Sequence, residues 1–365
     1  KAAGVYVSTA SGEPGEDAIV RVRGLGTVNG SSPLYVVDGQ FMDNISAVNP
    51  ADIDRIEVLK DASATAIYGS RGSNGVILIT TKGEQSGQTT VCLDASIGWR
   101  SSYKALDMMN SHQYYEFITT AYADEASFDK QKFTNQFNKG YDTDWWDEVT
   151  RSAFNQNYNL SVRTGTAKSR TALSLGYVDE QGALITTDFN RLNLRLNQEY
   201  DINKYVTVGA TINIADMRKK DAGALAHFDQ IQKADPFTPV INPLVEPGSE
   251  NYDYNTYAPT DRPGDPNPVS RLRLIDSHHN SFNAFGNLFA QVNLTHDLHY
   301  RFQLSFERDN DTYKSFTPVY ESVFSADNLA NMQSKSNTYT QLTHNTGWVK
   351  NYMVENRLNY THDFG

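Results

Sequence analysis

From about residue 91 onward, apolar and polar side chains alternate strictly along the chain. Leu192, Leu194 and Leu196 lie on one face of a predicted strand, and the residues between them are polar. The same alternation recurs over residues 158–162, 171–177, 206–214, 288–294, 300–306 and 352–360. Alternation with a period of two predicts β-strands that have one apolar face and one polar face.

The connections between these strands alternate between short and long. Gly165–Ser169, Asp201–Tyr205 and Thr295–Leu298 are tight turns. Long links are expected over about 102–154, 180–189, 216–282 and 310–345. Short turns at one end and long loops at the other are typical of an outer-membrane β-barrel. A soluble β-sandwich also alternates, but tyrosine and tryptophan near the strand ends favour the barrel, because aromatic girdles lie at membrane interfaces.

The chain has a different pattern up to about residue 83. Short apolar runs alternate with glycine-rich turns, which predicts strands near 5–7, 19–23, 34–38, 53–60 and 75–81. The alanine-rich segment from Asp61 to Tyr68 predicts one or two helical turns. The first part of the chain is therefore expected to be a small α+β unit.

The composition agrees with a β-sheet that is apolar on one face only. The 365 residues include 32 Lys plus Arg and 43 Asp plus Glu, a net charge of −11, which argues against a general nucleic-acid binder. The hydrophobic fraction of 39% lies below the globular average of about 45–50%. Mean hydropathy is −0.54, and no apolar run is long enough for a membrane helix. Cys92 is the single cysteine, so there is no internal disulfide.

Four motifs follow one another in the first unit: VRVRG at 20–24, PLYVVDG at 33–39, DIDRIEVLKD at 52–61 and ASATAIYGSRGSNGVI at 62–77. Together they resemble the plug domain of TonB-dependent outer-membrane transporters, in the SusC/RagA-like type of Bacteroidetes. Segments 143–148, 157–162, 174–177, 188–195 and 234–236 are similar to parts of the barrel of that type. The plug-motif residues are Arg23, Gly24, Tyr35, Asp38, Gly39, Arg55, Glu57, Lys60, Asp61, Tyr68, Gly69, Arg71, Gly72, Asn74 and Gly75.

The resemblance implies a membrane β-barrel with an N-terminal α+β plug domain inside its lumen. Residues 1–85 are expected to be the plug domain, incomplete at its N-terminus, and residues 86–365 the first part of the barrel with long extracellular loops. The family barrel has about twenty-two strands, and the alternation here accounts for about eight. An open sheet would expose unpaired backbone to lipid, so the remaining strands are expected from residues outside this chain or from another chain.

The function implied is TonB-dependent active import of a nutrient oligomer, a glycan or a peptide, across the outer membrane of a Gram-negative bacterium of the Bacteroidetes type. Its partners would be a SusD-like surface lipoprotein as a lid and TonB with ExbB and ExbD. Neither a nucleic acid nor an enzymatic activity is expected. Two alternatives are a surface-exposed binding or adhesion protein on a barrel scaffold and a soluble β-rich glycan-processing enzyme.

Two plug loops share one end of the unit, because two strand reversals separate Ser8–Asp17 from Phe41–Asn49. The resemblance turns this end toward the outside, as the floor of a substrate cavity. The substrate-facing candidates are Glu13, Glu16, Phe41, Asp43 and Asn44, and the alternative is that each is a turn residue.

No catalytic set and no metal site emerge from the sequence. His278-His279 and the pair His296 and His299 lack the cysteine or carboxylate frame of a zinc site. No cofactor is expected. Loop carboxylates leave calcium as an alternative, although no spacing fits an EF-hand loop. Those carboxylates are Asp124, Glu125, Asp142, Asp144, Asp147, Glu148, Glu246, Glu250, Asp253, Asp261 and Asp265.

Overall fold

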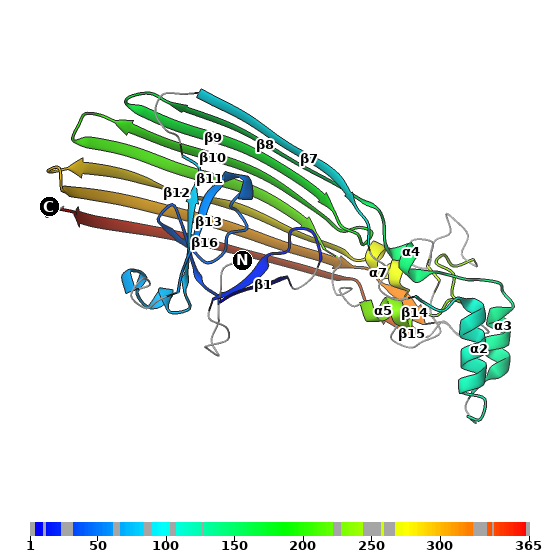
Figure 1. Cartoon of the computed structure of the whole chain (residues 1–365). Coiled ribbons are helices and arrows are strands. Elements are labelled where there is room, and N and C mark those ends of the chain that lie inside the picture. The colour runs from blue at the N-terminus through cyan, green and yellow to red at the C-terminus, as the bar shows by residue number, and fades with distance from the viewer. Residues whose placement is uncertain are drawn as a thin grey trace.

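The structure, a computed structural model, describes most of the chain. It covers residues 4–9, 12–22, 32–60, 66–83, 89–102, 107–125, 128–221, 228–243, 257–258, 267–323, 334–337 and 339–362. Eight long antiparallel strands form one sheet, the wall, and a smaller four-stranded sheet packs against one face of it. Figure 1 shows the wall as a single curved sheet.

The strands of the wall are neighbours in chain order, as in an up-and-down barrel. This confirms the expected barrel architecture and the count of eight strands. The strands are β7 (Thr89–Arg100), β8 (Ala153–Gly165), β9 (Ser169–Gln181), β10 (Asp188–Asp201), β11 (Val206–Lys220), β12 (Asp276–Asn293), β13 (Leu298–Thr317) and β16 (Gln341–Tyr360).

The strands are longer than the alternation suggested, so the long links are shorter. Three expected links, 180–189, 216–282 and 310–345, shrink to the segments between strands at 182–187, 221–275 and 318–340. The last contains the hairpin of β14 (Tyr320–Val323) and β15 (Ser334–Asn337). Alternation disappears before the strands end, because backbone pairing continues where both faces meet polar surroundings and no apolar side chain is needed.

The two faces of the wall differ as the alternation predicts. Leu192 and Leu194 point outward and are 49% and 41% exposed, while Asn193 and Arg195 point to the other face and are each 4% exposed. The outward apolar residues of the other strands include Val91, Leu93, Leu160, Leu173, Leu175, Leu288, Phe302, Leu304, Val354 and Leu358. An exposed apolar band on one face is what a membrane-facing wall requires.

The smaller sheet is the centre of the first unit. Its order is β4-β3-β6-β5, with β3 (Leu34–Val37) parallel to β6 (Val76–Thr81) and antiparallel to β4 (Gln40–Met42). Strand β5 (Ile53–Leu59) pairs with β6, and β1 (Val5–Thr9) forms a separate hairpin with β2 (Ala18–Val22). The sequence interpretation missed β4, which follows β3 after a two-residue turn at Asp38 and Gly39.

Two short 3₁₀ helices complete this unit. The first is η1 (Pro50–Asp52), and the second is η2 (Ala66–Gly72), where one or two α-helical turns were expected over 61–68. Residues 61–65 of that segment lie outside the described residues.

Side chains of the wall close the core of the first unit. Val22, Tyr35, Val37 and the neighbouring buried residues form one cluster that also contains Ala215 of β11 and Phe285 of β12. Phe285 is 2% exposed. The small unit therefore does not bury its apolar side chains by itself but relies on the wall.

Helices gather where the long links leave the wall (Figure 1). They are α2 (Ser111–Ala121), α3 (Lys130–Phe137), α4 (Trp145–Val149), α5 (Phe228–Lys233) and α7 (Pro268–Leu274). Helices α4, α5 and α7 share a core around Trp145, Ile231 and Leu272. Within the described residues, every helix is too short or too polar to cross a bilayer.

Replacing Leu194 with lysine tests the orientation of the wall. A lysine facing lipid near mid-membrane costs about 2–4 kcal/mol, so Leu194→Lys in the full-length protein should reduce the fraction of assembled barrel. That fraction is measured by heat-modifiable mobility on gels. Ala121→Lys, at an exposed position of α2, is the control and should assemble normally. Normal assembly of Leu194→Lys would contradict the outward orientation of Leu194.

Candidate functional site

The first unit is fastened to the polar face of the wall by hydrogen bonds from wall side chains to its loop 43–49. Asn193 donates through Nδ2 to the carbonyl of Ala47 at 3.0 Å, and Arg191 donates to the carbonyl of Ser46 at 3.1 Å. These contacts satisfy polar groups that the alternation turns away from the apolar face, so the loop and the wall depend on each other.

A glycine of the wall makes room for one of these contacts. Asn49 donates through Nδ2 to Oδ1 of Asn159 at 2.9 Å. The Asn49 amide lies directly over Gly176, where an added Cβ would come within 2.4 Å of Asn49 Nδ2. A larger residue at position 176 would push this side chain, and the loop with it, away from the wall.

Asp38 of the plug motif joins the first unit to a buried arginine. Its Oδ1 accepts from the backbone nitrogen of Thr81 at 2.9 Å, and its Oδ2 accepts from Thr81 Oγ1 at 2.5 Å. Arg195 of β10 lies 3.6 Å from Oδ2 of Asp38 and donates to Thr81 Oγ1 and to the carbonyl of Lys82. The motif aspartate therefore holds both the end of β6 and the wall.

A second loop of the first unit, residues 12–17, binds the wall through charge. Lys219 of β11 lies 3.0 Å from Glu16 and 3.6 Å from Glu13, and all three side chains are mostly buried. Gly15 has a φ of +69° and lies against the Phe189 ring, which an added Cβ would approach to 2.3 Å. The loop is therefore held by ion pairs and by close contact.

A cavity of about 300 Å³ opens between these two loops and the wall. Glu16, Asp17 and Asn44 line it from the first unit. Burial raises the pKa of the Asp17 carboxyl, and Glu16 raises it further. The wall contributes Phe189, Met217, Lys219, His279, Ser281, Asn283, Asp309 and Asp311, which lie toward the ends of their strands next to the long links.

A second cavity, of about 360 Å³, lies between the first unit and strands β13 and β16. Phe41, Asp43 and Arg71 line it from the first unit. Arg71 pairs with Asp43 at 2.9 Å, its guanidinium lies 5.7 Å from the centre of the Phe41 ring, and Phe41 makes an edge-on contact with Tyr68. The five substrate-facing candidates are thus divided: Glu16 and Asn44 line the first cavity, Phe41 and Asp43 line the second, and Glu13 pairs with Lys219.

The other plug-motif residues lie within the first unit. Tyr35 is part of the core, and Arg55 and Glu57 form an exposed pair at 3.5 Å. Asn74 donates to the carbonyl of Ser32 at 3.5 Å. Gly39, Gly69 and Gly75 have positive φ, Gly72 ends η2, and Lys60 directly follows β5. Arg23, Gly24 and Asp61 lie outside the described residues.

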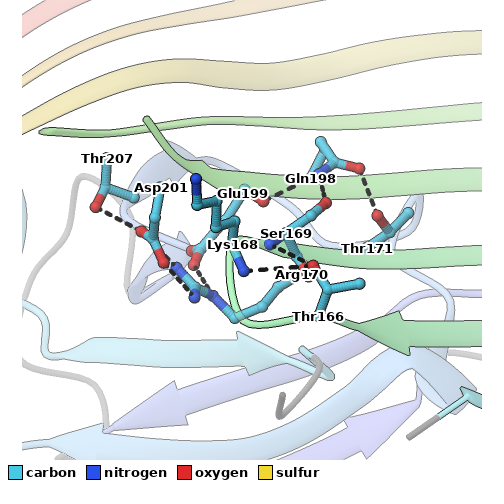
Figure 2. A network of polar contacts seen from close by, with 9 residues as sticks. All are labelled: Thr166, Lys168, Ser169, Arg170, Thr171, Gln198, Glu199, Asp201 and Thr207. Carbon is cyan, nitrogen blue, oxygen red and sulfur yellow. Dashed lines mark hydrogen bonds and ion pairs between the residues drawn. The ribbon is translucent and has the colours of Figure 1, made fainter. Parts of the chain in front are cut away.

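A polar network ties three strands together near the tight turns, and the sequence interpretation did not identify it (Figure 2). Arg170 of β9 pairs with Glu199 at 3.1 Å and with Asp201 at 2.8 Å, both on β10. Asp201 also accepts from Thr207 of β11 at 2.8 Å. The only signal of this network in the sequence is that oppositely charged residues lie on neighbouring strands. The register of the strands is needed to pair them.

At the opposite end, two motif segments that are far apart in the chain meet. Trp145 donates through its indole nitrogen to the carbonyl of Asp235 at 2.8 Å, and the backbone of Thr143 donates to that of Pro236 at 3.0 Å. Asp235 is buried, which raises the pKa of its carboxyl, while hydrogen bonds from Thr238 oppose that shift. The motifs at 143–148 and 234–236 therefore form one structural unit.

Two of the loop carboxylates that left calcium open have structural partners. Asp142 accepts from the backbone of Ser111 at 2.7 Å, and Asp144 caps α4. Across the described part of the chain, no three His, Cys, Asp or Glu side chains converge as metal ligands would. Glu246, Glu250, Asp253, Asp261 and Asp265 lie outside that part.

The histidines also pair with single carboxylates. His278 lies 2.8 Å from Asp276, His279 lies 3.1 Å from Asp311, and His296 contacts Asp297. His299 instead contacts the side chain of Asn293 at 2.8 Å.

Comparisons with known proteins agree with this arrangement. The family described as TonB-dependent Receptor Plug Domain matches residues 1–76. The chain is 32% identical over 317 residues to the TonB-dependent receptor SusC of Bacteroides thetaiotaomicron, across 79% of this chain and 30% of that protein. It is 27% identical over 365 residues to the TonB-dependent receptor P39 of Formosa agariphila, across 100% of this chain and 33% of that protein. The chain thus spans about a third of the length of these relatives.

Solved structures share the fold. The RagAB peptide importer in its closed-closed state aligns over 100% of this chain and 51% of the other, with a TM-score of 0.74 and 22% identity. Its open-open state aligns with a TM-score of 0.72. The first unit and the eight-stranded wall are therefore arranged as in these structures.

Replacing Arg195 tests whether the buried ion pair holds the two units together. Removing one partner of a buried pair costs about 3–5 kcal/mol, so Arg195→Met in the full-length protein should destabilise the seating of the first unit. The measurement is the urea concentration at which ion conductance appears in planar bilayers, and we expect it to fall. Arg55→Met is the control, because an exposed pair contributes at most about 1 kcal/mol. Equal midpoints for the two variants would show that Arg195 does not hold the first unit.

Proposed function

We propose that this chain, which belongs to the SusC/RagA-like family of TonB-dependent transporters, gates the import of a nutrient oligomer through an outer-membrane barrel. The observation that carries the proposal is the contact between the plug, as the first unit is now named, and the polar face of the wall. A wall that is apolar outside and occupied by a folded unit inside is suited to a gated channel and has no use in an adhesin.

The nature of that contact suits a plug that must move. Besides the packing of Ala215 and Phe285 on the plug core, it consists of separate hydrogen bonds and two ion-paired sites, Arg195 with Asp38 and Lys219 with Glu16. Such contacts break one at a time under a force applied at one edge, whereas a continuous apolar interface would have to separate all at once. In our proposal TonB, energised through ExbB and ExbD, supplies that force.

The two cavities between the plug and the wall support a polar, oligomeric substrate. Their linings combine carboxylates, amides, hydroxyls and a few aromatic rings, which are groups that bind hydroxyl-rich glycans or peptide backbones. The relative SusC and the RagAB peptide importer point to these two classes. We propose an oligosaccharide or an oligopeptide as the substrate.

Orientation and partners follow from the same proposal. The first cavity lies toward the end of the wall from which the long links emerge, so that end would face outside the cell. A SusD-like lipoprotein would cover it, in contact with the long loops. The relatives are named receptors, and the chain is not an enzyme.

Dependence on TonB tests the transport step. In cells that express the full-length protein as their only route for the nutrient, deletion of TonB should abolish uptake while the amount of assembled barrel stays the same. Uptake of labelled oligosaccharide and of labelled oligopeptide is measured in parallel. Uptake at the normal rate without TonB would refute active import.

Filling the first cavity tests its role. Asn44→Trp places an indole in that cavity and should strongly reduce uptake without reducing barrel assembly. Asp54→Trp, at an exposed position of β5 outside the cavity lining, is the matched control. Equal uptake by the two variants would remove this cavity from the substrate path.

A further inference from the structure

Strand β13 separates its charges by sign beyond the apolar band. Glu307, Asp309 and Asp311 face the cavities next to the plug. Arg308 and Lys314 occupy the alternate positions, so they point outward, and both are exposed. Carboxylates thus lie inside the wall and cations outside it. The outer cations point away from the plug and take no part in the ion pairs that hold it.

The outer cations begin where the apolar band ends. Phe306 of β13 lies opposite Tyr352 of β16, and at the next outward position Arg308 lies opposite Lys350. Directly opposed side chains have Cβ atoms about 4.5–5.5 Å apart, and two like charges in this position repel each other. Such a pair becomes favourable when an anion lies between the two cations.

Within the described residues, no carboxylate pairs with Arg308 or Lys350. Lys350 lies 5.1 Å above the ring of Trp348, which is itself 69% exposed. An exposed indole beside a cation is typical of the interface between lipid tails and headgroups. Two acidic residues of the outer face, Asp216 and Asp276, pair instead with Arg218 at 3.4 Å and Lys220 at 3.0 Å.

A second row of basic groups lies farther toward the long links. Lys220, His278, Lys314 and His344 are successive partners across four neighbouring strands, β11, β12, β13 and β16. Asp276 pairs with both Lys220 and His278, so within the described residues Arg308, Lys350 and Lys314 are the cations that remain for a ligand, and the apolar band borders them on one side. A ligand that fits this surface carries a negative headgroup and apolar chains.

We infer that the outer face of β13 and β16 binds the phosphate of a membrane lipid, with Arg308 and Lys350 as the two cations that hold it. Arginine and lysine both form charge-assisted hydrogen bonds to phosphate oxygens. The acyl chains of the same lipid would pack on Phe306 and Tyr352. Free phosphate offers the same headgroup chemistry but none of the apolar contact.

Lipid binding by the full-length protein in detergent tests this inference independently of transport. The probe is lipid A in mixed micelles, and bound lipid is counted by native mass spectrometry. We expect the double variant Arg308→Gln with Lys350→Gln to bind lipid A about thirtyfold more weakly, since each basic side chain near a membrane surface contributes about 1 kcal/mol. Lipid A without its phosphates should bind the unmodified protein as weakly.

Two controls keep the result interpretable. Lys168→Gln with Lys204→Gln removes the same charge next to the tight turns and should leave binding unchanged. Exchanging the two cations, Arg308→Lys with Lys350→Arg, should preserve binding, so it keeps the test valid if the glutamine variant fails to assemble. Unchanged lipid A binding by an assembled glutamine variant, loss of binding in the exchanged variant, equal binding of dephosphorylated lipid A, or displacement by equimolar inorganic phosphate would each overturn the inference.

Discussion

The structure depends on one constraint of the wall: each of its two faces needs a partner where water is absent. Its outward face is apolar and suits lipid. Its inward face presents asparagines, two arginines and a lysine that need hydrogen-bond partners where water is restricted. The plug provides these partners through backbone carbonyls at Ser46, Ala47 and Lys82. In return the wall completes the plug core with Phe285. Each unit is stable in this arrangement because the other is there.

The sequence was sufficient to predict which residues lie on each face of the wall. It was not sufficient to predict which wall residues contact the plug. Leu194 and Arg195 could be assigned to opposite faces, because a period of two is visible in a single strand. The partner of Arg195 could not be assigned, because Asp38 and Thr81 lie more than a hundred residues away. Only the tertiary arrangement brings them together, and the same holds for Lys219 with Glu16.

The errors in strand length have one physical origin. Hydrophobic alternation records where a strand meets lipid, whereas the strand itself ends where backbone pairing ends. In β13 the apolar alternation stops after Phe306, yet pairing with β16 continues to Thr317. Strand β4 was missed for the opposite reason: with three residues it is too short to show any period, and a turn at Asp38 and Gly39 defines it. Periodicity therefore underestimates long strands and overlooks short ones.

The polar ends of the long strands have a consequence for function. Once a strand leaves the apolar band, its two faces still look into different surroundings, and its charges can be sorted between them. In β13 the carboxylates line the cavities beside the plug and the cations face outward. A sequence of mixed charges that looks like an ordinary solvated loop is thus a strand with two chemistries. The inner face lines the cavities beside the plug, and the outer face places two opposed cations where the apolar surface ends.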